Sequence, residues 1–271
     1  MPIIEFIDIS KSYKKDEEVL YSLNMEVNRG EIITILGESG SGKTTMLKLV
    51  NRMINFDTGE LRVQGKNIKE WDKVELRRHI GYVIQQIGLF PHMTIWENIS
   101  YVLMLENKKK QERLKCAFEL LELVGLPKDY AYRYPRELSG GQKQRIGVAR
   151  ALAANPDIIL MDEPFGAVDE KTRAQLQDEL LKIQKALHKT ILFVTHDIHE
   201  ALKMGSRIAL LNKGRIEQIG TGRELILNPK NEFVKNFFGI KGFTFMLDED
   251  KLEGLYKRVL NKEIELEELL K

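Results

Sequence analysis

Cysteine is almost absent from this chain, since one thiol, Cys116, occurs in 271 residues. A disulfide framework is therefore excluded, and one thiol in a chain of this size fits a reducing compartment. A chain this long can bury a core that needs no covalent cross-links. We expect one large α/β domain, or one such domain with a small appendage, in the cytoplasm.

Long apolar runs and an excess of charge are also missing. No uninterrupted apolar run approaches the roughly 20 residues of a membrane-spanning helix. The first five residues (MPIIE) lack the basic start and apolar centre of a signal peptide. The 42 basic and 40 acidic residues leave a formal charge of +2, which gives no electrostatic footprint for nucleic acid. We therefore expect a chain that is soluble by itself and has no nucleic-acid partner.

Strand-like segments dominate the start of the chain and helix-like segments its middle. Residues 3–36 contain short β-rich runs separated by turns, and a further β-rich piece covers residues 59–63. A helix is expected from Lys43, and residues 111–124 have apolar side chains at helical spacing. The middle of the chain is therefore predicted to be a helical insertion.

The later part of the chain has the pattern of a βαβ unit. Residues 158–161 and 191–195 are short apolar strands on either side of a helix. Its core face is expected at Leu176, Leu180, Ile183 and Leu187. Residues 207–219 predict a hairpin that turns at Lys213-Gly214.

Residues 37–45 (GESGSGKTT) complete the phosphate-loop pattern Gly-x4-Gly-Lys-Thr between an apolar strand and a helix. Glycines let the backbone N–H groups face inward, and the helix N-terminus adds partial positive charge. Lys43 is expected to reach the β- and γ-phosphates, and Thr44 to offer its hydroxyl to Mg²⁺. The alternative, a turn without a ligand, is disfavoured by the complete motif. The expected nucleotide contacts are Gly37, Glu38, Ser39, Gly40, Ser41, Gly42, Lys43, Thr44 and Thr45.

Two carboxylates, Asp162 and Glu163, end the apolar strand at residues 158–161. The end of such a strand is where α/β sheets place their ligand chemistry. Asp162 is expected to hold Mg²⁺ or its water, and Glu163 to polarise the water that attacks the γ-phosphate. Without the phosphate loop, such a pair would more often be a solvated turn.

A second candidate anion site lies at residues 138–142 (LSGGQ). Ser139 can cap the amphipathic helix that follows, whose N-terminus favours negative charge. Taken alone, this stretch is better explained by a serine that merely caps a helix, with the glycines as loop.

At this point the chain resembles the nucleotide-binding subunit of ATP-binding cassette (ABC) transporters. Five motifs occur in the same order, namely GESGSGKTT, ELSGGQKQR, IILMDEP, AVD at residues 167–169 and FVTHD at residues 193–197. LSGGQ separates this family from other P-loop NTPases. The resemblance covers about residues 3–240 and implies a P-loop ABC-ATPase fold of the α/β class, with the ABC ATPase domain at residues 1–240. That fold has a RecA-like core, an antiparallel β subdomain and a helical subdomain at about residues 88–155.

The resemblance implies that ATP binding brings two copies together as a homodimer around two ATP molecules. The signature residues of one copy would meet the ATP held by Lys43 of the other. These residues are Ser139, Gly140, Gly141 and Gln142.

The same resemblance gives roles to single residues. Gln85 would contact Mg²⁺ and water, and Glu163 would be the catalytic base. His196 would contact the γ-phosphate, and Asp169 would lie at the dimer contact. Tyr13 matches the aromatic residue on which the family stacks adenine. The alternatives are an ordinary histidine at a strand end and an exposed tyrosine in a turn.

Residues 80–94 (IGYVIQQIGLFPHMT) are expected at the surface, where they could dock a membrane subunit. The alternative is core packing of Leu89 and Phe90. With PFGAVD and LHKT, this stretch is similar to importers of osmoprotectants such as glycine betaine, carnitine and choline. That likeness implies permease subunits at the cytoplasmic face of the membrane and, indirectly, a substrate-binding protein.

The alternative functions are import of another small solute such as an amino acid, a soluble ABC ATPase outside transport, and a P-loop kinase, which LSGGQ disfavours. Residues 241–271 form a Lys/Glu-rich helical appendage that could reinforce a dimer or could equally be a frayed tail. This stretch is too short for the CBS modules common in the osmoprotectant branch.

Overall fold

The computed structural model describes residues 2–14, 17–85, 87–166 and 168–246, together with 257–258 and 261. Its strands are β1 (Pro2–Lys14), β2 (Glu17–Asn28), β3 (Ile32–Leu36), β4 (Thr58–Val63), β5 (Lys66–Asn67), β6 (Ile80–Val83), β7 (Ile158–Asp162), β8 (Thr190–Thr195), β9 (Arg207–Asn212) and β10 (Arg215–Gly220). Its helices are α1 (Lys43–Val50), α2 (Lys73–Arg78), α3 (Ile95–Ile99), α4 (Tyr101–Leu105), α5 (Lys110–Leu123), α6 (Gly140–Leu152), α7 (Glu170–Leu187), α8 (Ile198–Met204), α9 (Gly222–Leu227) and α10 (Glu232–Met246). Short 3-10 turns cover Ile68–Glu70, Lys128–Tyr132 and Pro135–Glu137.

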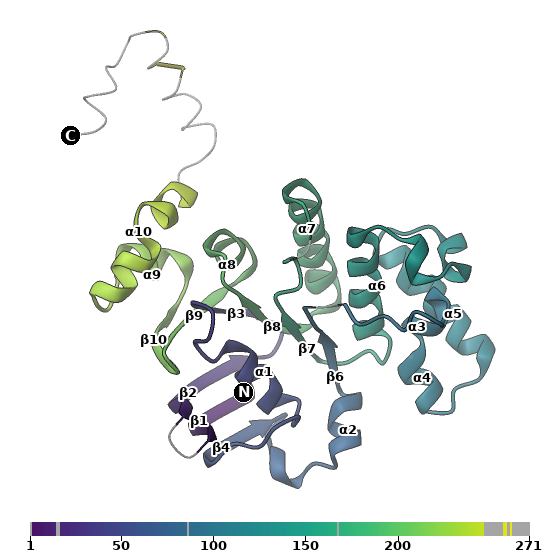
Figure 1. The fold of residues 1–271 in the computed structure, drawn as a ribbon, viewed down its shortest axis with the longest axis horizontal. Helices are drawn as coiled ribbons and strands as arrows, with labels where there is room; N and C mark the ends of the chain where they lie inside the picture. Colours follow the sequence, from purple (N-terminus) through teal and green to yellow (C-terminus); the bar gives the residue numbers. More distant parts are fainter. Residues whose placement is uncertain are drawn as a thin grey trace.

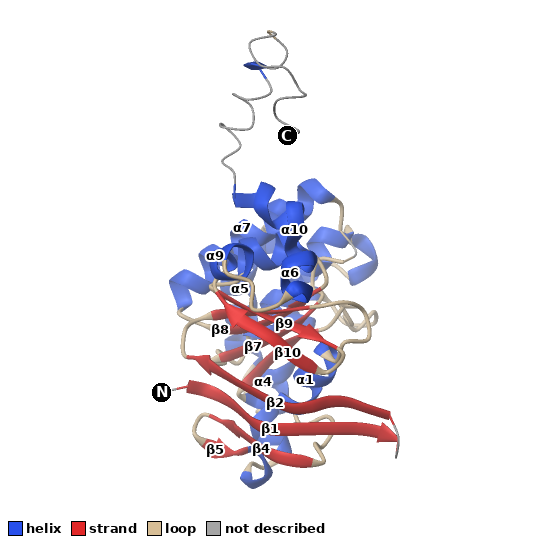
Figure 2. Cartoon of the chain, turned by 90° about the vertical axis from the view of Figure 1, so that its left-hand side faces the viewer, coloured by secondary structure: helices blue, strands red, loops and turns tan. Residues whose placement is uncertain are grey.

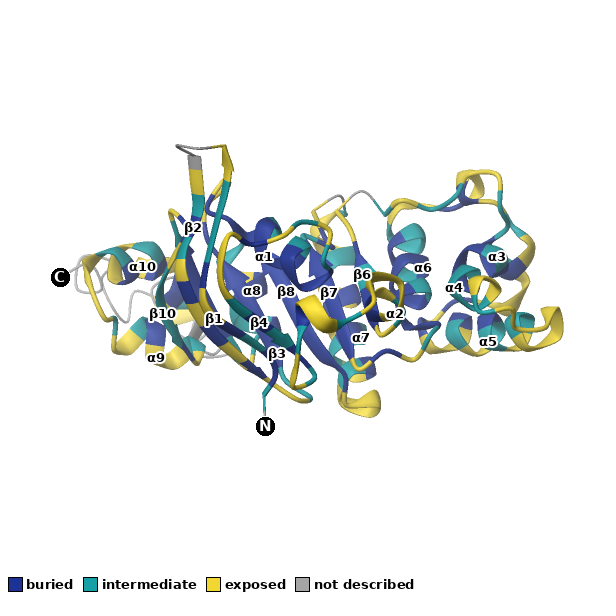
Figure 3. Ribbon diagram, turned by 90° about the horizontal axis from the view of Figure 1, so that it is seen from below, coloured by how far each residue is buried: buried dark blue, intermediate teal, exposed yellow. Residues whose placement is uncertain are grey.

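The central sheet has six strands in the order β10-β9-β3-β8-β7-β6 (Figure 1). All its pairs are parallel except the β9–β10 hairpin. Every residue of β3, β7 and β8 is buried, as expected for parallel strands covered on both faces (Figure 3). These three strands therefore place the residues that follow them on a closely packed support.

A second sheet, with the order β2-β1-β4-β5, is antiparallel and lies below the first in Figure 2. Both sheets contribute to one apolar cluster, which includes Phe6, Leu61 and Val194. The same cluster takes in Met46 and Leu47 of α1. The helix that follows the phosphate loop is therefore packed between the two sheets.

A second cluster joins the other face of the central sheet to α6, α7 and the helical part of the chain. Phe193 of β8 and Ile146 of α6 belong to it, as does Leu121 of α5. In Figure 1, α3, α4, α5 and α6 gather at one end of the molecule, farthest from α9 and α10. A third cluster packs α8, α9 and α10 beside β9.

This architecture confirms the predicted α/β class with its antiparallel and helical parts. The βαβ unit is β7–α7–β8, and the hairpin is β9–β10. Among the described residues, no helix combines the length and apolarity needed to cross a bilayer.

Two details of the sequence interpretation are wrong. Residues 80–83 do not lie at the surface, because they form the edge strand β6, with Ile80 and Val83 buried. The first polar residue after this strand is Gln85. The apolar residues 80–83 before it therefore belong to the sheet, and the chain leaves the sheet only after them. Leu187 is not on the core face of α7, because its side chain is 38% exposed. The helix ends at Leu187, and its C-cap residue His188 has a left-handed φ of 49°.

The predicted division at residue 240 falls inside α10, next to a kink at Gly239. Gly239 has a φ of 44°, which glycine adopts without steric cost. Most of the predicted appendage at 241–271 lies outside the described residues. The division of the chain at this point, like the limits of the helical subdomain, stays a prediction.

Candidate functional site

Four neighbouring strands of the central sheet are followed by the predicted catalytic segments. Parallel strands bring their carboxyl ends to one edge, where α/β sheets bind ligands. The phosphate loop follows β3, His196 follows β8, Glu163 follows β7, and Gln85 comes two residues after β6. Because β3, β8, β7 and β6 are adjacent in that order, the sheet assembles one site from distant parts of the sequence (Figure 1).

The phosphate loop curls tightly at its glycines. Gly40 and Gly42 have φ values of 80° and 107°, in the left-handed region that favours glycine. A Cβ on Gly37 would lie 2.2 Å from the carbonyl oxygen of Leu211. The hydroxyl of Ser41 is buried without a hydrogen-bond partner among the described residues. The loop therefore has no room for a side chain at position 37, and it keeps an unsatisfied polar atom.

Lys43 is almost fully buried under this loop. Its Nζ donates hydrogen bonds of 2.8 Å to the carbonyl oxygens of both Gly37 and Glu38. Burial lowers the pKa of Lys43, while the carboxylates of Glu163 and Asp162 oppose that shift. The ammonium group is thus held inside the loop, close to two acids.

Thr44 and Asp162 bring two oxygen ligands together beside the loop. The Thr44 hydroxyl donates to Asp162 Oδ1 over 2.9 Å. Burial is the main reason why the pKa of Asp162 is raised, and the charge of Glu163 adds to it. A cation at this place would relieve that cost, because it would stabilise the ionised carboxylate.

Glu163 is the centre of a small polar cluster. Gln85 donates from Nε2 to Glu163 Oε2 over 3.0 Å, and His196 Nδ1 lies 3.2 Å from Glu163 Oε1. The backbone of Glu163 has a φ of 45°, an uncommon conformation for a residue with a side chain. Such outliers persist where the surrounding structure holds them, and they concentrate at functional sites.

A cavity of about 420 Å³ joins these groups. It is lined by Tyr13, Val19, Ser39, Gly40, Gly42, Lys43, Thr44, Thr45, Gln85 and Glu163. The Tyr13 hydroxyl lies 3.2 Å from the Thr45 hydroxyl, and the Tyr13 side chain is half exposed at the cavity wall. Its ring is therefore open to a planar ligand.

Residues of the LSGGQ stretch and Asp169 do not line this cavity. Ser139 caps α6 in a capping box with Gln142, and Asp169 caps α7 through the N–H of Thr172. Hydrogen bonds with Thr172 lower the pKa of Asp169. The two caps lie close together, since a Cβ on Gly141 would be 2.7 Å from Thr172 Cγ2. Within one chain they form a separate polar surface.

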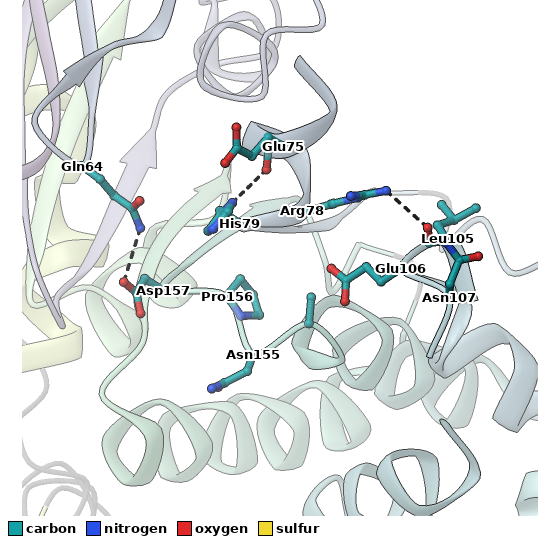
Figure 4. Close-up of a pocket in the computed structure, with 11 residues that line it drawn as sticks. Gln64, Glu75, Arg78, His79, Leu105, Glu106, Asn107, Asn155, Pro156 and Asp157 are labelled. Atoms are coloured by element: carbon teal, nitrogen blue, oxygen red, sulfur yellow. Dashed lines mark hydrogen bonds between the residues drawn. The ribbon is translucent and has the colours of Figure 1, made fainter. Parts of the chain in front are cut away.

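A larger cavity, of about 530 Å³, lies at the opposite edge of the sheet (Figure 4). His79 and Asp157, which precede β6 and β7, line it. Gln64 donates to Asp157 across its wall over 3.3 Å. It contains no glycine-rich loop and none of the predicted site residues, so cavity size alone does not locate the nucleotide site.

The residues at the carboxyl edge fit a magnesium nucleotide. The buried Lys43, the inward-curled glycine loop and the unpartnered Ser41 hydroxyl suit phosphate oxygens. Hydroxyl and carboxylate oxygens at Thr44 and Asp162 are the ligand types that Mg²⁺ prefers. The described residues contain no cluster of three histidine, cysteine or acidic side chains suited to a tightly held metal.

Comparison with known sequences decides the family. The sequence model described as ABC transporter matches residues 20–166, which is more than half of the chain. The chain belongs to the ABC transporter family.

Three curated relatives of this ABC protein are transport ATP-binding proteins. It is 54% identical to the choline transport ATP-binding protein OpuBA of Bacillus subtilis (strain 168), over 86% of this chain and 61% of that relative. It is 53% identical to the glycine betaine/carnitine/choline transport ATP-binding protein OpuCA of the same organism, over 88% and 62%. It is 51% identical to the osmoprotectant import ATP-binding protein OsmV of Salmonella typhimurium, over 80% and 57%. The ABC chain thus spans about three fifths of the length of these relatives.

Two solved structures of an ABC cassette, MJ0796, resemble the fold. One is the dimeric bacterial ABC transporter cassette, with a TM-score of 0.73 and 38% identity over 80% of this chain and 98% of that chain. The other is the dimeric post-hydrolysis state bound to ADP and Pi, with a TM-score of 0.72 and 37% identity over the same shares. The likeness confirms the expected ABC-ATPase fold.

Sequence reasoning missed two residues near the site of this ABC chain. Val19 lines the cavity from β2, and Arg150 of α6 binds the backbone just after Gln85. Val19 gave no signal, because one apolar residue in a strand is indistinguishable from a core residue. Arg150 stands in a helical pattern whose polar positions usually face solvent.

Proposed function

We propose that this chain is the ATP-hydrolysing subunit of an ABC importer that drives a separate membrane permease. The observation that carries the proposal is the cluster in which Gln85 and His196 meet Glu163 beside the buried Lys43. A positioned carboxylate with two polar neighbours suits the activation of water at a γ-phosphate. The names of the relatives point to the same activity.

Each residue has a separate task in this proposal. The loop N–H groups and Lys43 bind the phosphates of ATP, and the ring of Tyr13 stacks on adenine. Glu163 accepts a proton from the attacking water, while Gln85 orients that water and His196 donates to the γ-phosphate. These tasks need Gln85 and His196 close to the Glu163 carboxylate. Both side chains already lie within hydrogen-bond distance of it.

Mg²⁺ would be held by Thr44 and Asp162, with Gln85 beside it. When bound, the ion neutralises charge on the β- and γ-phosphate oxygens. The protein prepares this place by keeping the Thr44 hydroxyl and the Asp162 carboxylate 2.9 Å apart. The raised pKa of Asp162 returns toward its usual range when a cation pairs with it.

A second copy would complete the site. Ser139, Gly140, Gly141 and Gln142 lie away from the cavity of their own chain, and the helix N-terminus that follows Ser139 suits an anion. Asp169 lies beside that surface. The dimeric state of the related cassette supports pairing of two copies around two ATP molecules.

The transported solute is proposed to be an osmoprotectant of the glycine betaine, carnitine or choline type. This assignment follows the names of relatives that are 50–54% identical. The permease subunits would hold the protein at the cytoplasmic face of the membrane and receive solute from a substrate-binding protein. The partly buried Phe90 and Met93, after Gln85, are the proposed contact with the permease.

Two measurements test this function. Release of phosphate from ATP by the purified chain tests the ATPase, and uptake of radiolabelled choline, carnitine and glycine betaine by cells that also express its permease and binding protein tests transport. The Glu163→Gln variant serves as the inactive control. Absence of phosphate release contradicts the ATPase, and uptake of none of the three solutes contradicts the substrate class.

The composite site has its own test. Lys43→Ala and Ser139→Arg copies should each be inactive alone, because each spoils both sites of a homodimer. Mixed in equal amounts, they should recover ATP hydrolysis, because one site of each mixed dimer has a native Lys43 facing a native Ser139. No recovery on mixing contradicts the composite site.

A further inference from the structure

The C-terminal half of α6 is fastened to the segment that follows Gln85. Arg150 donates from Nη2 to the carbonyl oxygen of Ile87 over 2.6 Å and from Nη1 to that of Gly88 over 2.7 Å. The N–H groups of a guanidinium lie in one plane, so two such bonds fix orientation as well as distance. Arg150 therefore determines where this part of the backbone lies.

Direct packing reinforces this connection. A Cβ on Gly81 of β6 would lie 2.4 Å from the carbonyl oxygen of Ala151, so no side chain separates strand and helix there. A Cβ on Gly147 would lie 3.2 Å from Ile87 Cγ2. Because protein interiors are close-packed, α6 cannot shift along β6 without moving this segment.

The two ends of α6 serve different parts of the proposed site. Its first residues follow Ser139, which would face the nucleotide of the partner copy. Arg150 lies about 16 Å farther along the same helix, at a rise of 1.5 Å per residue. Gln85 is only two residues from Ile87, and its amide donates to Glu163. One rigid helix thus links the signature residues to a neighbour of the proposed base.

We propose that Arg150 is a positioning residue that sets Gln85 against Glu163 through the carbonyl groups of Ile87 and Gly88. The consequence is that Gln85 takes its working position only when α6 does. Contact of Ser139 with the partner's nucleotide then affects, through α6, the position of Gln85 against Glu163 of the same chain. This inference rests on the proposed function, because it takes Glu163 as the base.

The segment beyond Gly88 has an independent anchor. Asn98 is fully buried; its Oδ1 accepts from the Phe90 N–H over 2.7 Å, and its Nδ2 donates to the Phe90 and Met93 carbonyls over 3.1 Å each. The segment with Phe90 and Met93, the proposed permease contact, therefore keeps its shape when Arg150 is altered. A change at Arg150 acts selectively on the part next to Gln85.

The test compares Arg150→Lys and Arg150→Ala with Arg77→Lys as the matched control. Arg77, on α2, also donates to two carbonyl oxygens, those of Asn51 and Arg52, but neither of them belongs to the segment after Gln85. The Arg150 variants should lower kcat for ATP by about 10-fold to 100-fold, because a misplaced catalytic group costs that much. KM for ATP should stay within about twofold, because the Lys43 loop is untouched. The control should retain native kcat.

A double-variant cycle with Gln85→Ala shows whether Arg150 acts through Gln85. In that background, Arg150→Lys should lower kcat by less than about twofold further, because the side chain it positions is already gone. Losses that multiply would mean that Arg150 acts independently of Gln85, and the inference would be wrong. A kcat in Arg150→Lys equal to that of the control would overturn it as well.

Hydrogen exchange gives a readout that does not need turnover. The amides of residues 87–89 should exchange faster in Arg150→Lys than in the native chain or in Arg77→Lys, whereas the Phe90 amide, held by Asn98, should not change. Unchanged exchange in that segment overturns the inference. A native chain that releases no phosphate contradicts the proposed function instead, so the two failures are distinguishable.

Discussion

Replacing Glu163 by glutamine removes the proposed base while leaving the shape of the site almost intact. The amide is nearly isosteric with the carboxylate, so its oxygen can still accept the hydrogen bond from Gln85. Its NH₂ group cannot accept one from His196 and cannot take a proton from water. ATP binding should therefore survive, because Lys43 and the loop carry it.

The size of the effect follows from the role. General base catalysis contributes about 10²-fold to 10⁴-fold, which corresponds to about 2.7–5.4 kcal/mol of activation free energy. The side chain of Glu163 is 19% exposed, so water can reach it. A free water molecule cannot substitute for a base that is held in a fixed position. We expect kcat for ATP hydrolysis to fall by at least about 100-fold with little change in ATP affinity.

The assay measures phosphate release under saturating ATP, and a fluorescent ATP analogue gives the affinity. Glu170→Gln is the matched control, because Glu170 is an exposed acid in the first turn of α7. Size-exclusion chromatography with ATP should show a dimer that persists only in the Glu163 variant. A variant that keeps more than about one third of the native rate would refute the assignment of Glu163 as the base.

Other perturbations test separate parts of the site. Lys43→Ala should weaken binding of the fluorescent ATP analogue by at least about tenfold, because a charged hydrogen bond contributes about 1.5–3 kcal/mol; unchanged affinity would contradict its phosphate role. Burial raises the pKa of Asp162, and a protonated carboxyl cannot hold Mg²⁺. Mg²⁺-dependent ATP binding, measured as a function of pH, should therefore weaken as pH falls. The loss should begin at a higher pH than it would for an aspartate with an ordinary pKa. Asp162→Asn should abolish this pH dependence, and a native chain without it would contradict the metal role. Phe90→Asp should reduce stimulation of ATP hydrolysis by the permease, and unchanged co-purification with the permease would contradict the docking surface.

Local chemistry made much of the site predictable from sequence. The phosphate loop has its glycines, lysine and threonine at fixed spacing within nine residues, so this short segment alone predicts the loop. The alternation of apolar strands and helices likewise gave the βαβ unit and the hairpin. The resemblance to ABC transporters supplied Gln85, His196 and Tyr13, and the fold places Gln85 and Tyr13 at the cavity and His196 against Glu163.

Features that depend on long-range packing were not predictable. The local sequence does not show that the apolar residues 80–83 belong to the central sheet. Only their pairing with β7, far away in the sequence, shows that they do. Leu187 fits the helical pattern, but it is the last residue of α7 and is exposed there. The role of Arg150 depends on a contact across more than 60 residues of sequence, and no pattern within α6 distinguishes it from a solvated arginine.

The order of strands in the central sheet has a consequence for how the chain assembles during synthesis. β3 pairs only with β8 and β9, more than 150 residues later in the chain. By contrast, β1 pairs with both β2 and β4 within the first 63 residues. Because non-local pairing is slow, we expect the antiparallel sheet to form early on the ribosome. The nucleotide pocket would close only after β9 has emerged, so the ability to bind ATP would mark a chain whose folding is nearly complete.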